Sequence, residues 1–144
     1  ICLSIDGGMM TPNDIISAAR SACDVPFRHQ GRDPAIGLDC IGLIAHIARI
    51  FGLPHQDRLD YGRTPGTGEL EAAIGRQPCL ERISSLEPAC VVLFRISRSP
   101  QHVGIYTGES MVHAWSDAGK VCEHPLDDRW RSRIVRMYRF KAPS

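Results

Sequence analysis

The stretch "GLDCIGLIAHIARIFG", residues 37–52, predicts a central buried helix that begins at a cysteine. Asp39 can cap this helix, because its carboxylate can accept hydrogen bonds from the free amides of the first turn. Apolar residues fill nearly every later position, which leaves almost no polar face, and a glycine and a proline follow its end. We therefore expect a helix over residues 40–51 that packs in the core and carries Cys40 in its first turn.

The segments on either side of this helix predict an α+β fold. Thr11, Pro12 and Asp14 provide a capping box and a proline at the first helical position, ahead of "IISAARSAC". "ELEAAIGRQ" is typical of a further short helix. From position 90 the sequence changes to short β-branched and aromatic runs separated by turn residues: "CVVLFRI", "HVGIYT", "SMVHAW", "KVCEH" and "RIVRMYRF". We expect N-terminal helices packed on a C-terminal antiparallel meander of about five or six strands.

The composition of the 144 residues indicates one globular domain, with 43% hydrophobic and 23% charged residues. A net charge of +1 gives no reason to expect binding to nucleic acid, and no apolar run approaches the roughly 20 residues that span a bilayer. No signal-peptide pattern is present, so we expect a carrier if the protein acts outside the cytoplasm. "MMTPND" is typical of a natural beginning, so residues 1–8 are treated as an upstream segment and 9–144 as the single domain.

The six cysteines and six histidines include neither a C-x-x-C pair nor an H-x-x-x-H pair, so the sequence predicts neither a metal site nor a cofactor. A single cysteine is by default a small buried hydrophobe. Cys40 differs because the start of a helix stabilises a thiolate and offers amides to an oxyanion. We therefore expect a depressed pKa for Cys40.

The stretch "HVGIYTGESMVHAW", residues 102–115, predicts a β-hairpin with a Gly108-Glu109 loop. In that register His113 lies opposite Gly104, and His102 shares its face, so the two histidines form a diagonal cross-strand pair. One ring could face the Cys40 thiol while the other orients it. His124 borders a turn and is expected to be a surface group.

The motifs "DCIGL", "HVGIY" and "VHAW" resemble those of the NlpC/P60 family, papain-like cysteine peptidases that cleave cell-wall peptides. The resemblance implies that Cys40 is the nucleophile, His102 the general base and then acid, and His113 the orienting third member. It also implies that the substrate is a peptidoglycan stem peptide, cut between D-glutamate and diaminopimelate through an acyl-enzyme.

Two further segments, "PFRHQG" and "WRSRIVRMYRF", are similar to the phage-tail-associated branch of that family. This likeness implies delivery by a phage or phage-like tail, with tail hub or tip proteins as partners. The protein would then be made in the cytoplasm, travel in the virion tail and act on the cell wall in the periplasm. The arginine-rich C-terminal segment and residues 1–8 are candidates for docking to the tail.

Three positions depart from the family pattern: Phe27 stands where a tyrosine is common, Ile41 replaces a serine, and Ala89-Cys90 replaces Gly-Asp. Phe27, Asp39 and Trp115 are the candidate substrate-binding residues. For Asp39 the first interpretation is the helix cap, with contact to a substrate amine as the alternative. Trp115 either packs at the rim of the core or flanks the site.

Two other functions remain open at this stage. A tail-tip structural subunit could keep the fold without activity, which the changes at Phe27 and Ile41 favour and the intact Cys-His-His set opposes. An acyltransferase or amidase of the same papain-like class would use the same three residues on a different bond.

Overall fold

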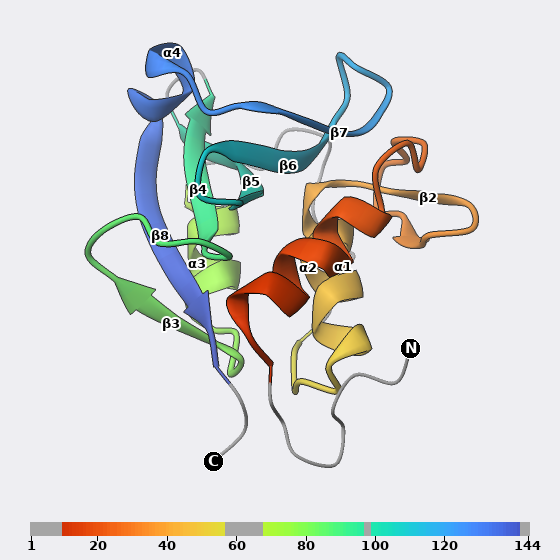
Figure 1. The fold of residues 1–144 in the computed structure, drawn as a ribbon, viewed down its shortest axis with the longest axis horizontal. Helices are drawn as coiled ribbons and strands as arrows, with labels where there is room; N and C mark the ends of the chain where they lie inside the picture. Colours follow the sequence, from red (N-terminus) through yellow and green to blue (C-terminus); the bar gives the residue numbers. More distant parts are fainter. Residues whose placement is uncertain (1–9, 57–67, 97–98, 142–144) are drawn as a thin grey trace.

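The computed structural model describes residues 10–56, 68–96 and 99–141 as an α+β domain (Figure 1). The expected upstream segment, residues 1–8, lies outside this range. The helices are α1 (Pro12–Ser21), α2 (Cys40–Ile50), α3 (Glu69–Gly75) and α4 (Asp128–Arg131). The strands are β1 (Arg32–Asp33), β2 (Gly37–Leu38), β3 (Leu80–Ile83), β4 (Val91–Ile96), β5 (Ser99–Tyr106), β6 (Ser110–Trp115), β7 (Lys120–Pro125) and β8 (Ile134–Phe140). Within the described ranges, no helix is both long enough and apolar enough to cross a bilayer.

The starts of α1 and α2 follow the predicted capping chemistry. Thr11 Oγ1 accepts from the Asp14 amide at 3.2 Å, and Asp14 Oδ2 accepts from the Thr11 amide at 3.1 Å, which completes the capping box. Helix α2 begins at Cys40 as expected and ends at Ile50, one residue before the predicted end.

A six-stranded antiparallel sheet in the order β3-β8-β4-β5-β6-β7 forms the second half of the fold. Strands β4 to β7 make the predicted meander, whereas β8 returns to pair with the outer side of β4 and β3 pairs with β8. Tyr106 lies opposite Met111, and the Thr107 amide donates to the Ser110 carbonyl at 2.9 Å, so the predicted hairpin register is confirmed. The sequence did not predict β3, the β1–β2 hairpin or α4.

The central strands bury both of their faces. Val103, Ile105 and Val112 belong to one core cluster with side chains of α1, α2 and α3, and we call this side the helix face. Phe94 and Met111 belong to a second cluster that includes Trp130 from α4, and we call this side the aromatic face. Because strand side chains alternate, His102 and His113 lie on the aromatic face.

Candidate functional site

Cys40 occupies the first turn of α2, as expected, but its thiol is not activated in the way the sequence predicted. Burial, followed by the neighbouring Asp39 carboxylate, raises the pKa of Cys40 to about 12. Hydrogen bonding from the backbone amides of Val103 and Ile41 opposes that rise but is outweighed. The expectation of a depressed pKa is therefore wrong, because desolvation of the anion exceeds the stabilisation by the helix start. The thiol is protonated at neutral pH.

The Asp39 carboxylate accepts hydrogen bonds from several groups around the start of α2. The residue is 4% exposed, and its Oδ1 accepts from the Gly42 amide at 2.8 Å and from Arg32 Nη1 at 3.1 Å. Oδ2 accepts from the Gln30 amide at 2.8 Å. The capping role is thus confirmed, and the same carboxylate ties the loop before the helix to its first turn. Contact of Asp39 with a substrate amine stays a prediction.

The predicted histidine pair is confirmed by a direct hydrogen bond. His102 Nε2 and His113 Nδ1 lie 2.6 Å apart, and both side chains are buried. Gly104 lies opposite His113, where a Cβ would come within 3.1 Å of the His113 Cβ. The glycine therefore leaves room for the imidazole that the neighbouring strand places beside it.

A third histidine extends this pair, contrary to the expectation that it is a surface group. His124 Nε2 lies 2.8 Å from His113 Nε2, and His124 Nδ1 lies 3.0 Å from the Pro125 carbonyl oxygen. In β7, Cys122 is the partner of His113. His124 follows Cys122 by two residues, so its side chain lies on the same face of the sheet. We call His102, His113 and His124 the histidine relay. The register of β7 is the signal that could have revealed its third member.

The hydrogen bonds of the relay fix where its protons lie when each ring carries one. The Pro125 carbonyl can only accept, so His124 Nδ1 is the donor and His124 Nε2 is an acceptor. His113 then donates from Nε2 and accepts at Nδ1, where His102 donates from its own Nε2. The relay therefore leaves His102 Nδ1 without a proton, as a base.

Electrostatics keep the two buried rings neutral. Burial, with a smaller contribution from His124, lowers the pKa of His102 to about 3. Burial, followed by the charges of His102 and His124, lowers the pKa of His113 to about 2. At neutral pH the site thus holds a protonated thiol and a neutral imidazole base rather than a preformed ion pair.

Two adjacent residues of β5 connect the thiol with the relay. The amide that hydrogen-bonds towards the Cys40 sulfur belongs to Val103, the residue directly after His102. Among the described residues, the thiol and the His102 ring make no hydrogen bond to each other, while His102 Nε2 bonds to His113. The sulfur and the His102 ring must therefore approach each other for proton transfer, as is common before substrate binds.

Two tryptophans enclose the relay on the aromatic face. The Trp115 ring lies 4.9 Å from His102 and stacks on His113 with a 27° interplanar angle. Trp130 meets the edge of His113 at 5.2 Å. Trp115 thus flanks the candidate site, which is one of its two predicted roles. Its contact with a substrate is still a prediction.

Phe27 lies in the segment that pairs with the residues just before α2. It packs partly buried against the helix-face core and pairs with Leu38, the residue before Asp39. Its amide donates to the Gly119 carbonyl at 2.9 Å. Phe27 therefore pairs with a residue that lies just before the start of α2. Its role in substrate binding stays a prediction.

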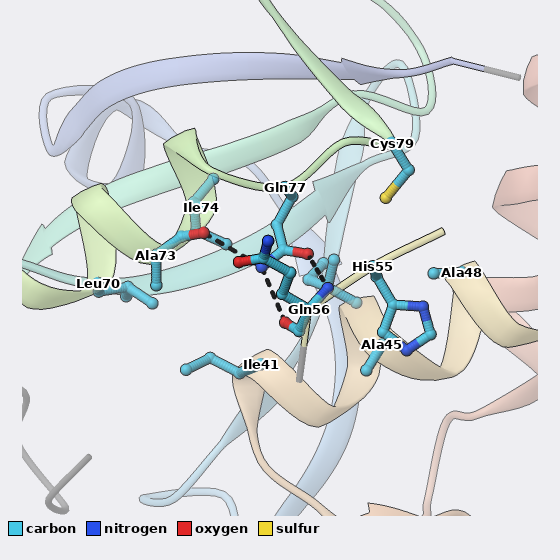
Figure 2. Close-up of a pocket in the computed structure, with 11 residues that line it drawn as sticks. Ile41, Ala45, Ala48, His55, Gln56, Leu70, Ala73, Ile74, Gln77 and Cys79 are labelled. Atoms are coloured by element: carbon cyan, nitrogen blue, oxygen red, sulfur yellow. Dashed lines mark hydrogen bonds between the residues drawn. The ribbon is translucent and has the colours of Figure 1, made fainter. Parts of the chain in front are cut away.

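An apolar pocket lies between α2 and α3 (Figure 2). Ile41, the residue after the cysteine, is part of its lining. Gln77 closes one side by accepting from the Gln56 amide at 2.8 Å and donating to the Gln56 carbonyl at 2.9 Å. Ile41 thus contributes to the apolar lining of this pocket. The pocket does not include the relay.

Comparison with known proteins agrees with this architecture. The chain matches the model of the NlpC/P60 family over residues 24–139. The NlpC/p60 domain of the peptidoglycan hydrolase SagA is similar at 19% identity and a TM-score of 0.60, with 90% of this chain and 99% of that one covered. The peptidoglycan hydrolase RipB of Mycobacterium tuberculosis is similar at 20% identity and a TM-score of 0.58, with 92% and 65% covered.

A lipoprotein-like NLP/P60 protein of Staphylococcus aureus is similar at 17% identity and a TM-score of 0.66. The match covers 94% of this chain and 43% of the staphylococcal chain, so this chain spans less than half of that protein. These likenesses confirm the predicted α+β fold, with helices before a six-stranded antiparallel sheet.

Proposed function

This chain belongs to the NlpC/P60 family, and on that premise we propose that it is a cysteine peptidase that hydrolyses peptidoglycan stem peptides. One observation carries the proposal. The Cys40 thiol lies beside Val103, and the residue before Val103 is His102, whose Nδ1 is left unprotonated by the relay. A nucleophile, a base and an orienting partner are the groups that acyl transfer needs.

The chemistry follows from the protonation states of the site. His102 Nδ1 takes the thiol proton as Cys40 Sγ attacks the substrate carbonyl, and the carbonyl oxygen becomes an oxyanion near the amides at the start of α2. His102 then gives that proton to the leaving amine, which leaves a thioester on Cys40. Water, activated by His102, hydrolyses the thioester and restores the thiol. His113 and His124 keep His102 in the tautomer that this sequence of steps requires.

The proposed substrate is the bond between D-glutamate and diaminopimelate. Peptidoglycan hydrolases among the structural neighbours, SagA and RipB, support a cell-wall substrate. The specific bond rests on the resemblance of the three motifs to the family. Mass analysis of the fragments released from purified peptidoglycan would identify it, and stem peptides that stay uncut but carry new acyl groups would indicate a transferase instead.

Delivery by a phage or phage-like tail is part of the same proposal. It rests on the likeness of residues 26–31 and 130–140 to the tail-associated branch. The protein is then expected to co-sediment with purified tail particles through its hub or tip proteins. If it is found only in the fractions of free protein from cells that produce such particles, tail delivery is wrong.

The test of the activity is digestion of purified peptidoglycan by the parent protein and by Cys40→Ala. The parent is expected to release soluble peptides and the variant none. Cys23→Ser is the matched control, because Cys23 is another partly exposed thiol and should keep the activity. If the folded parent releases no more peptide than Cys40→Ala, the non-catalytic structural role is the better account.

A further inference from the structure

We propose that His113, Cys122 and His124 form a zinc site whose occupation switches off the histidine relay. One atom from each residue, the two imidazole nitrogens and the sulfur, lies within 4.8 Å of the others. All three side chains lie on the aromatic face, because Cys122 is the strand partner of His113 and His124 follows two residues later. The metal site itself is independent of the proposed function, whereas the inhibition rests on it.

The donor set suits a zinc-class ion. Two imidazoles and one thiolate are ligands that Zn²⁺ accepts, and three protein ligands leave a fourth position for water. Tetrahedral bonds of about 2.0–2.3 Å would put the donor atoms about 3.3–3.6 Å apart, so the present cluster needs only small side-chain shifts. Cys122 and His124 are partly exposed, which gives an ion a path from solvent to the buried His113.

Both imidazoles already have a hydrogen-bond partner at the ring nitrogen that would face away from the ion. Histidines that bind a metal usually donate from their other ring nitrogen to a carbonyl or a similar acceptor. His124 does so through Nδ1 to the Pro125 carbonyl, which directs Nε2 towards His113. His113 has its own partner at Nδ1, the ring of His102. Both imidazoles are thus oriented before an ion arrives.

Zinc at this site would reverse the direction of the hydrogen bond between His113 and His102. When the ion takes the lone pair of His113 Nε2, the single proton of that ring must lie on Nδ1. His113 then donates to His102 Nε2, and His102 must carry its own proton on Nδ1. Each ring keeps one proton, and the only proton released comes from the Cys122 thiol. His102 can then no longer accept the proton of the Cys40 thiol, so zinc inhibits hydrolysis.

The sequence did not predict this site, because its ligands follow neither a helical nor a C-x-x-C spacing. The pattern Cys-x-His at positions 122–124 places two ligands on one face of a strand. Only the pairing of β6 with β7 brings His113 beside them.

The test separates zinc binding from catalysis. Zn²⁺ is titrated into the parent protein, Cys40→Ala, Cys122→Ser and Cys23→Ser, with a chromogenic chelator as competitor. We expect one equivalent to bind the parent, Cys40→Ala and Cys23→Ser alike, and Cys122→Ser to bind at least about tenfold more weakly. Co²⁺ should give a thiolate charge-transfer band with the parent and Cys40→Ala but not with Cys122→Ser. Absence of binding, or binding that depends on Cys40 rather than Cys122, overturns the site.

Inhibition is then measured as peptide release with and without Zn²⁺, each protein against its own zinc-free rate. The parent should be strongly inhibited and Cys122→Ser should need at least about tenfold more zinc. Equal inhibition of both proteins overturns the switch even if the ion binds. If the parent is inactive without zinc, the proposed function fails, while the chelator and Co²⁺ results still decide the metal site.

Discussion

The two faces of the central sheet come from the same strands, yet they hold different kinds of core. On the helix face, the side chains of Val103, Ile105 and Val112 pack in an apolar cluster with residues of the helices. On the aromatic face, His102 and His113 are equally buried but are linked to each other and to His124. Within the described residues, each buried side-chain nitrogen and oxygen has a hydrogen-bond partner. Buried imidazoles are therefore tolerated on this face because the relay satisfies their hydrogen-bonding nitrogens.

The largest expected effect separates the two faces by function. His102→Gln should lower peptide release by about 10²–10⁴-fold, because it removes the proposed general base. Ile105→Val on the helix face should lower the free energy of unfolding by about 0.5–1.5 kcal/mol and keep activity per folded molecule. Peptide-release assays combined with urea unfolding measure both effects. Similar activity losses in the two variants would contradict the assignment of function to one face.

A steric change tests how closely the relay must be held. Gly104→Ala would place a Cβ 3.1 Å from the His113 Cβ and 3.2 Å from the Val112 carbonyl oxygen. Displacement of His113 should lower the hydrolysis rate by about tenfold or more. Gly75→Ala is the control, because its Cβ would meet nothing within 4 Å. Unchanged rates for both variants would show that the position of His113 does not matter.

The buried rings predict a loss of stability in acid. The unfolded chain protonates histidine near pH 6.5, whereas His102 and His113 have pKa values of about 3 and 2 in the folded protein. The unfolded state therefore binds more protons as the pH falls from about 6.5 to about 3. The free energy of unfolding should fall by up to about 1.4 kcal/mol per pH unit for each histidine.

Chemical denaturation at a series of pH values measures this slope. His113→Gln should make it shallower, because one of the two groups no longer titrates. An unchanged slope in that variant would mean that acid acts elsewhere.

The smallest expected effect concerns the entry to β4. Ala89 has a φ of 76°, a backbone region that favours glycine. Ala89→Gly should stabilise the fold by up to about 1 kcal/mol, because it relieves that strain. Ala114→Gly, within β6 on the helix face, should destabilise it instead. Thermal unfolding compares the two, and an equal loss in both would rule out strain at Ala89.

The sequence predicted the parts of the site that local patterns determine. The cap at Asp39 and the start of α2 at Cys40 follow from helix chemistry, and the His102–His113 pair follows from a tight hairpin. His124 was missed because its place depends on the register between β6 and β7. The turn that joins these strands is longer than the one between β5 and β6, so the sequence does not determine that register. The pKa of Cys40 was misjudged because burial depends on the packing of α2 against β5, which no local pattern reports.

The position of the proton on His102 is the most direct test of the account. Nitrogen-15 NMR of the imidazole rings at neutral pH, assigned with His102→Gln and His113→Gln, reports the tautomer of each ring. We expect a neutral His102 with its proton on Nε2 and an unprotonated Nδ1. A proton on Nδ1 in the metal-free protein would contradict it, because His102 could not then accept the proton of the Cys40 thiol.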